Sequence, residues 1–97
     1  MKFEWDDNKN RQNLQKHGIS FEEAQEIFNS IVFTSIDERY DYYDYNEIRE
    51  ISIGAIEGLV IIIVAHTTRD NKIRLISARK ATPKERKTYY AYLAQSS

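Results

Sequence analysis

The alternation of apolar and polar residues first predicts one short strand and two helices. Residues 2–5 have an extended pattern, and residues 7–17 form a polar segment that begins with acidic residues and ends with a Lys–His pair. Acids at the start, cations at the end and a glycine stop at Gly18 are typical of a short helix. A second helix follows at once. Ser20 and Glu23 form its capping-box pair. Its apolar positions at helical spacing are Phe21, Ala24, Ile27 and Phe28.

Further extended segments follow these helices. Residues 31–36 and 48–56 are rich in β-branched and aromatic side chains, which indicates strands. Residues 59–65 are apolar at every position, which is typical of a central strand buried on both faces. Residues 72–80 form the last such segment, after an Asp–Asn turn signal. Successive strands on tight turns predict an antiparallel sheet.

The final helix has the clearest start signal in the chain. Thr82 is a typical N-cap, Pro83 stands at the first helical position, and Glu85 lies three residues past the cap. A chain of 97 residues is the size of one domain, so we expect residues 1–97 to form a single unit. The expected class is α+β, with an antiparallel, mainly four-stranded sheet, two N-terminal helices and one C-terminal helix.

Composition then excludes several kinds of site. The chain has no cysteine, which excludes disulfides and cysteine-based metal sites. His17 and His66 lie far apart and outside any zinc-type spacing, and His17 is better explained as a cation at a helix end. The longest apolar run, residues 59–65, is too short to span a bilayer, and the N-terminus has no apolar signal region. We therefore expect a cytoplasmic protein without metal, cofactor or membrane contact.

The net charge of −1 hides an asymmetry along the chain. Residues 1–65 carry 6 Lys and Arg against 13 Asp and Glu, a net charge of −7, whereas residues 66–97 carry 8 against 2, a net charge of +6. A cationic block suggests an anionic partner, nucleic acid foremost. Alternatively, the two parts of the chain neutralise each other across the fold.

The joint between the last strand and the last helix concentrates this positive charge. Strand alternation predicts Arg74 and Lys80 on one face of the sheet and Arg79 on the other. The start of the helix then adds further cations and free backbone N–H groups. Cations are unfavourable at a helix N-terminus unless the joint binds an anion such as phosphate. The alternative is an exposed face that pairs with the acidic part of the chain.

Two other features allow more than one interpretation. His66 stands at the end of the buried strand, where it could transfer protons near neutral pH or simply form a structural hydrogen bond. Residues 37–47 alternate tyrosines with acids, which would repel a phosphate backbone. We interpret them as a solvated loop, an edge strand or a patch that binds a basic protein.

Three segments together resemble a known family. These are "FEWDDNKNRQNLQKHGISFEEAQEIF", "REISIGAIEGLVIIIVAHTTRDNKIRLISARKA" and "ERKTYY". They are similar to the BrnT family of toxins from bacterial type II toxin–antitoxin pairs. The resemblance implies a RelE-like ribonuclease fold and cleavage of RNA that blocks translation and growth. It also implies a BrnA-like antitoxin with a ribbon-helix-helix part, through which alone DNA would be contacted.

The resemblance can be carried over only at matching positions. These are His66, Arg69, Arg74, Arg79, Lys80, Glu85, Arg86 and Tyr89, with Arg49 and Gly54 in the strand before them. The first hypothesis is a metal-independent endoribonuclease with Arg74 and Arg79 as phosphate clamps and with His66 or Glu85 as the proton-transfer residue. Cations expected to hold the flanking RNA are Arg69, Lys80, Lys84, Arg86 and Lys87. The alternative is a non-catalytic RNA- or protein-binding module.

Overall fold

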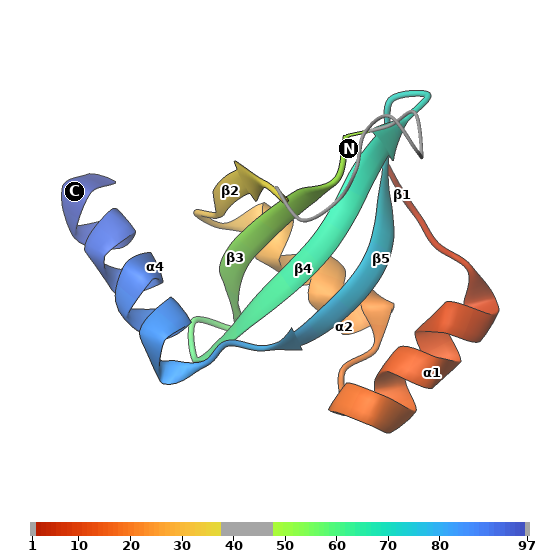
Figure 1. Ribbon diagram of the computed structural model, residues 1–97, viewed down its shortest axis with the longest axis horizontal. Coiled ribbons are helices and arrows are strands. Elements are labelled where there is room, and N and C mark those ends of the chain that lie inside the picture. Colours follow the sequence, from red (N-terminus) through yellow and green to blue (C-terminus); the bar gives the residue numbers. More distant parts are fainter. Residues whose placement is uncertain (1, 38–47, 97) are drawn as a thin grey trace.

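A five-stranded sheet forms the centre of the protein. The computed structural model describes residues 2–37 and 48–96. Along the chain the elements are β1 (Lys2–Glu4), α1 (Asp7–His17), α2 (Phe21–Ala24), the 3₁₀ helix η1 (Gln25–Asn29), β2 (Phe33–Ile36), β3 (Glu50–Ile56), β4 (Val60–Arg69), β5 (Lys72–Lys80) and α4 (Pro83–Ser96). The strands lie in the order β1-β5-β4-β3-β2, as Figure 1 shows.

The α+β class and the central position of β4 confirm the sequence prediction, but the number of strands does not. Strands β2 to β5 pair antiparallel, and β1 adds a fifth strand parallel to β5. A parallel partner needs a long crossover connection, and here the whole chain between β1 and β5 provides it. The pattern at residues 2–5 indicates a strand, but nothing in it names a partner so far away in the sequence.

The largest differences between the predicted and observed element boundaries lie at two places. The second helix changes from α to 3₁₀ at Gln25, and β4 continues through polar residues as far as Arg69. The turn before β5 is therefore only Asp70 and Asn71, with φ of 49° and 64°, a left-handed conformation that both residue types tolerate. The tyrosine-rich segment lies outside the described residues, apart from Asp37.

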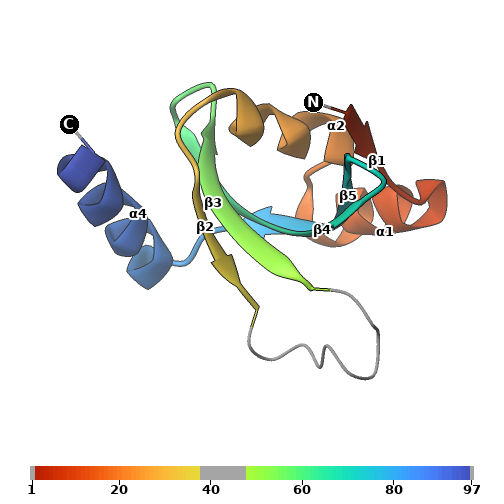
Figure 2. The ribbon, with the colours of Figure 1, turned by 90° about the horizontal axis from the view of Figure 1, so that it is seen from above.

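The helices of the first third cover one face of the sheet, and α4 lies on the other side (Figure 2). A Cβ atom on Gly54 would lie 2.7 Å from Ile27 Cβ and 3.0 Å from Val32 Cγ1, closer than side chains normally approach. The 3₁₀ helix can therefore rest directly on β3 only because this position is glycine. The core on this face consists of Ile19, Phe21, Ala24, Ile27, Ile62, Val64, Leu75 and Ala78.

A smaller cluster lies between α4 and the opposite face. The buried Tyr89 hydroxyl donates a hydrogen bond of 2.7 Å to the Ile31 carbonyl, and Tyr92 stacks on Phe33 with ring centroids 4.7 Å apart. These contacts fasten α4 to the edge of the sheet formed by β2. The buried members of this cluster are Ile53, Ile61, Ile63, Ala81 and Tyr89.

An extra residue in β5 changes which side chains share a face. Ala65 lies opposite Ser77, but the next residue of β4, His66, lies opposite Leu75. Ile76 is therefore a bulged residue without a partner on β4. Such a bulge shifts the alternation of the strand by one position.

The face assignment predicted for β5 is wrong because of this bulge. Strict alternation places Leu75 and Ala78 on opposite faces, yet both belong to the core beneath α1 and α2. It also separates Arg74 from Arg79, whereas the bulge returns both to the face opposite those helices. Arg74 and Arg79 thus share one face of the sheet, whereas the sequence pattern predicts opposite faces for them.

The outer edge of β5 is completed by a side chain instead of a strand. β1 pairs with β5 only from Lys72 to Arg74. Farther along, the buried Asn13 of α1 accepts a hydrogen bond of 3.0 Å from the Ala78 N–H and donates one of 2.9 Å to the Ala78 carbonyl. It also donates to the Ile19 carbonyl at 2.8 Å. One amide thereby satisfies buried backbone groups of two segments.

Replacing Asn13 with alanine should lower the free energy of unfolding by about 2–4 kcal/mol, because three buried backbone groups lose their partner. Urea denaturation followed by circular dichroism measures this difference. Gln12→Ala on the same helix is the matched control, since Gln12 is exposed, and we expect a change below about 0.5 kcal/mol. Equal effects of the two substitutions would show that the Asn13 contact does not stabilise the sheet edge.

Candidate functional site

A small polar hollow lies on the face of the sheet opposite α1 and α2. Its volume is about 240 Å³. The hollow brings together parts of the chain that are far apart in sequence, namely the end of β2, strands β3 to β5 and the start of α4. Its lining residues are Asp37, Arg49, Ile51, Ile63, Ala65, Ser77, Arg79 and Glu85.

Arg79 and Glu85 form a bidentate ion pair in this hollow. The guanidinium donates to the two carboxylate oxygens at 2.8 and 2.9 Å. Glu85 Oε1 also accepts a hydrogen bond of 2.8 Å from the Thr82 N–H, and the Thr82 hydroxyl accepts one from the Glu85 N–H. The capping box predicted for α4 is therefore present, and its glutamate also fixes the direction of Arg79.

The pairing changes the acid–base properties of both groups. Hydrogen bonding to Arg79 lowers the pKa of Glu85 to about 2, with further lowering by the Thr82 N–H. The same contact raises the pKa of Arg79. The carboxylate is therefore ionised at every pH at which a cell operates, and it accepts protons only weakly while the pair is intact.

Arg49 and Asp37 supply the other charged groups of the hollow. Arg49 Nε lies 3.8 Å from Asp37 Oδ2, and the Asp37 N–H donates a hydrogen bond of 2.8 Å to the Arg49 carbonyl. Both side chains are largely shielded from solvent, with Asp37 7% exposed. The site thus holds two guanidinium groups, each next to a carboxylate, on one face of the sheet.

His66 does not join this site. It is only 4% exposed and lies on the face covered by η1, where its ring meets Phe28 edge-on with centroids 5.2 Å apart. Its Nε2 atom lies 2.7 Å from the buried Ser52 hydroxyl, which in turn lies 2.7 Å from the Thr34 hydroxyl. The expectation that His66 and Arg79 act on one phosphate is wrong, because the sheet separates them.

Arg74 and Arg69 lie away from the hollow. Arg74 Nη1 is 3.8 Å from Glu4 Oε1 on β1, so this predicted clamp has a partner of its own. Arg79 lies five positions farther along β5, which corresponds to about 16 Å of extended strand. Arg69 is exposed at the far end of β4. A single phosphate therefore does not reach Arg74 and Arg79 together, and that part of the predicted clamp is wrong.

The remaining predicted RNA-binding cations surround the joint. Lys84, Arg86 and Lys87 are exposed on the first turns of α4, and Arg86 donates a hydrogen bond of 3.2 Å to the Ala81 carbonyl. Lys80 lies opposite Ile62, so its side chain leaves β5 on the face opposite Arg79. The cations of α4 are thus near the hollow, whereas Lys80 points away from it.

Three polar residues that line the hollow have no predicted role. Arg49 is only a position shared with the family, and Asp37 and Ser77 belong to no motif in the sequence. The sequence does contain a signal for Asp37 and Arg49. They lie at the two ends of the acidic segment, next to strands that pair with each other, and this pairing brings them together. Ser77 lies two positions before Arg79 in regular register, so strand alternation alone places it on the Arg79 face.

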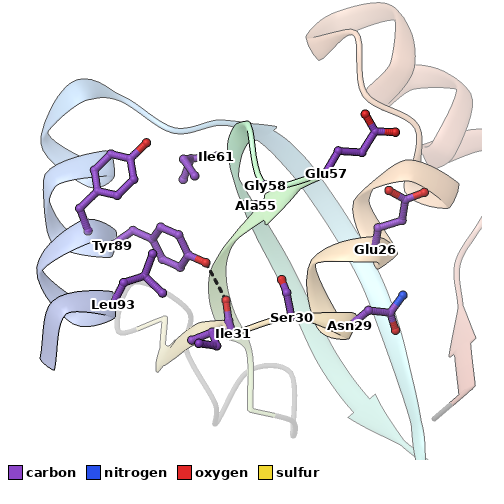
Figure 3. Close-up of a pocket in the computed structure, with 11 residues that line it drawn as sticks. Glu26, Asn29, Ser30, Ile31, Ala55, Glu57, Gly58, Ile61, Tyr89 and Leu93 are labelled. Atoms are coloured by element: carbon purple, nitrogen blue, oxygen red, sulfur yellow. Dashed lines mark hydrogen bonds between the residues drawn. The ribbon is translucent and has the colours of Figure 1, made fainter. Parts of the chain in front are cut away.

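A second and larger cavity, of about 550 Å³, has a different chemical character (Figure 3). It lies between α4, η1 and the turn that joins β3 to β4, and apolar side chains such as Ile31, Ile61 and Leu93 line it. The charged side chains among its lining residues are Glu26 and Glu57. An RNA backbone is disfavoured there, because both charges repel phosphate.

Comparisons with known proteins agree with the resemblance seen in the sequence. A family model described as "Ribonuclease toxin, BrnT, of type II toxin-antitoxin system" matches residues 5–85. The chain belongs to the BrnT family. Among solved structures it is similar to the crystal structure of the Brucella abortus ribonuclease toxin, BrnT, with 30% identity and a TM-score of 0.64. That match covers 84% of this chain and 97% of the other, and comparison with curated proteins gives no match.

The BrnT family match includes all the charged residues of the polar hollow, since Asp37, Arg49, Arg79 and Glu85 fall between residues 5 and 85. Most of α4 lies beyond it. Within the described residues, no group of three or more His, Cys, Asp or Glu side chains is placed to hold a metal ion. None of the described helices is long and apolar enough to cross a membrane.

The burial of His66 gives a testable dependence of stability on pH. Burial lowers the pKa of His66 from 6.5 to about 4, so the folded protein holds the neutral ring. Its contribution is complete above pH 6.5 and is lost as the pH falls towards 4, because only the unfolded chain takes up the proton there. We expect a loss on the order of 3 kcal/mol over this window, measured by urea denaturation.

The variant His66→Gln should remove this part of the pH dependence, because an amide does not titrate. Loss of stability linked to Glu85 falls at lower pH, between 4.5 and 2, so the two contributions can be told apart. If His66→Gln does not fold, NMR of the His66 ring provides the same information. A ring that becomes protonated near pH 6.5 in the folded protein would contradict the buried neutral state.

Proposed function

We propose that this BrnT family protein is a metal-independent endoribonuclease with its catalytic centre in the polar hollow. The observation that carries the proposal is the bidentate Arg79–Glu85 pair on the same face as Arg49. Guanidinium groups bind phosphate oxygens in the same two-point manner as they bind a carboxylate. The family description as a ribonuclease toxin supports RNA as the substrate.

In the proposed reaction, the RNA 2′-hydroxyl attacks the adjacent phosphorus atom. A P–O2′ bond forms, the P–O5′ bond breaks, and the product carries a 2′,3′-cyclic phosphate. Arg79 and Arg49 stabilise the additional negative charge on the phosphate oxygens. Glu85 takes the proton of the 2′-hydroxyl, and the departing 5′-oxygen receives a proton from solvent. DNA has no 2′-hydroxyl, so it is not cleaved.

Substrate binding would make Glu85 a stronger base. In the free protein the Arg79 contact holds the Glu85 pKa near 2, too low for efficient proton transfer at neutral pH. A phosphate that binds Arg79 shares its N–H donors and adds a negative charge beside the carboxylate. Both effects raise the pKa of Glu85 towards neutrality. The base would thus become effective only when RNA occupies the hollow.

The cations of α4 extend this site. Lys84, Arg86 and Lys87 lie on the helix that follows Glu85, where they would contact the RNA backbone next to the cleaved phosphate. Arg69, Arg74 and Lys80 lie elsewhere on the described surface, and any contact they make with RNA would be distant from the cleaved bond. We therefore propose that Arg79, Glu85 and Arg49 perform the chemistry and that α4 contributes affinity.

The test is cleavage of a defined RNA oligonucleotide in EDTA by purified variants. Glu85→Gln keeps an acceptor for the Thr82 N–H but removes the base, so we expect kcat to fall about 10²–10⁴-fold. Arg79→Lys keeps the charge but loses the bidentate geometry, and we expect a loss of about 10–100-fold. Thr82→Ala is the matched control: it weakens the helix cap by about 1 kcal/mol and should leave kcat within about threefold.

Each of the following results would support a different alternative to the proposed mechanism. RNA that is bound but not cleaved by the wild-type protein would favour the non-catalytic binding module. Equal losses of activity in Glu85→Gln and Thr82→Ala would show that Glu85 acts only as a cap. Cleavage of an oligonucleotide with a 2′-deoxyribose at the cut site would contradict attack by the 2′-hydroxyl. Circular dichroism confirms that each variant is folded.

We further propose that RNA cleavage inhibits translation and growth until a cognate ribbon-helix-helix antitoxin binds the protein. The type II toxin–antitoxin family supports a protein partner. The apolar cavity of Figure 3 is the docking surface that suits it, because Ile31 and Tyr90 are 51% and 53% exposed there. The proposed occupant is an amphipathic segment of the antitoxin whose basic residues face Glu26 and Glu57. A second copy of the chain would instead bring these carboxylates together.

Ile31→Asp and Tyr90→Asp should each weaken antitoxin binding at least tenfold, because each buries a new charge against the apolar segment. Isothermal titration calorimetry with the cognate antitoxin measures this loss. Leu14→Asp is the matched control, since Leu14 is similarly exposed, at 48%, on the unrelated surface of α1. Wild-type affinity in both groove variants would place the antitoxin on another surface. If the substitutions change the molecular mass of the isolated toxin in solution, this surface instead mediates self-association.

A further inference from the structure

A third hollow lies beside the candidate catalytic centre, between α1 and the outer edge of β5. Its volume is about 240 Å³. Ser77 lines both this hollow and the one that contains Arg79, so the two adjoin across β5. The remaining lining residues are Lys9, Gln12, Asn13, Lys16, His17 and Ile76. We call this third hollow the α1 hollow.

Two features described above create the α1 hollow. β1 leaves β5 after Arg74, and α1 approaches the uncovered edge through the Asn13 hydrogen bonds to Ala78. The bulge at Ile76 then widens the strand at this point. Lys9 and Lys16 lie seven residues apart, two helical turns, and therefore project from the same side of α1 as Asn13.

The lysines of the α1 hollow have no evident structural task. Among the described residues, neither the Lys9 nor the Lys16 ammonium group forms a salt bridge, although Lys9 lies near the exposed carboxylate of Asp6. Lys16 and His17 are favourable at the end of α1, because the helix dipole is negative there. Lys9 stands in the first turn, where a cation opposes the dipole. Its position is thus unexplained by the stability of the helix.

We propose that the α1 hollow binds a backbone phosphate of the RNA strand next to the phosphate that is cleaved. This inference rests on the proposed ribonuclease function. From Arg79, one way for the RNA strand runs over α4, and a second way runs past Ser77, which lines both hollows, onto α1. The second way leads directly to Lys9 and Lys16, whose ammonium groups suit a phosphate as point charges. The contact uses phosphate alone, so it does not distinguish the bases.

The first experiment measures binding without cleavage. The probe is a fluorescent oligonucleotide of about ten nucleotides with 2′-deoxyribose throughout, which the proposed chemistry cannot cut. We expect Lys9→Ala/Lys16→Ala to bind roughly tenfold more weakly in low salt and to reduce the slope of log K against log salt by about 1.4, for two phosphate contacts on a single strand. Fluorescence anisotropy provides both values.

Arg11→Ala/Lys72→Ala is the matched control. It removes the same charge from exposed positions, one on the opposite side of α1 and one at the far end of β5. We expect its affinity and salt slope to stay close to wild type. If the control loses as much as Lys9→Ala/Lys16→Ala, the effect is a general loss of charge and the proposed site is wrong.

The second experiment separates this inference from the proposed function. With a dinucleotide substrate, which is too short to reach α1, Lys9→Ala/Lys16→Ala should keep wild-type kcat/KM. With a ten-nucleotide RNA its KM should rise about tenfold at unchanged kcat. Wild-type KM for both substrates would overturn the α1 site while leaving the nuclease proposal intact. Binding that depends on Lys9 and Lys16, without any cleavage by the wild-type protein, would overturn the proposed function alone.

Discussion

The bidentate contact between Arg79 and Glu85 is the interaction on which the candidate site depends. It joins the end of β5 to the first turn of α4, and the same carboxylate closes the helix cap at Thr82. Two parallel hydrogen bonds fix angle as well as distance, so the pair sets the direction in which α4 leaves the sheet. A partly exposed pair of this kind adds little stability, and its main effect is therefore geometric.

This contact also orients one of the cations at the joint, Arg79, in a way that suits the proposed phosphate. A carboxylate offers a guanidinium two oxygens in one plane, and a phosphate can offer two oxygens at similar spacing. Glu85 therefore holds Arg79 in an orientation that phosphate can use with little rearrangement, and the entropy of ordering the long side chain is lost on folding and not on binding. Arg49, held near Asp37, stands on the same face in a comparable state.

Local signals predict most of the elements, whereas the relations between distant segments are less accessible. Capping patterns at Ser20 and Thr82 correctly place helix starts, because each depends on residues within one turn. The bulge at Ile76 has no local signature, so the faces of Arg74 and Arg79 were assigned incorrectly. His66 was a reasonable proton-transfer candidate by residue type. Its burial arises because β4 continues as a strand beyond residue 65 and brings the ring next to Ser52 of β3. The residues after 65 are polar, so the sequence does not predict that the strand continues.

The two ends of α4 connect the proposed RNA site with the proposed partner surface. Its first turn holds Glu85 against Arg79, and its later turns place Tyr89 and Leu93 in the apolar cavity. A helix moves largely as a rigid body, so a partner that shifts the later turns of α4 also changes the position of Glu85. Under the two proposals, an antitoxin bound in the apolar cavity would impair the proposed chemistry without covering the arginines. Because the carboxylates of that cavity disfavour phosphate, the antitoxin and the RNA need not compete for the same surface.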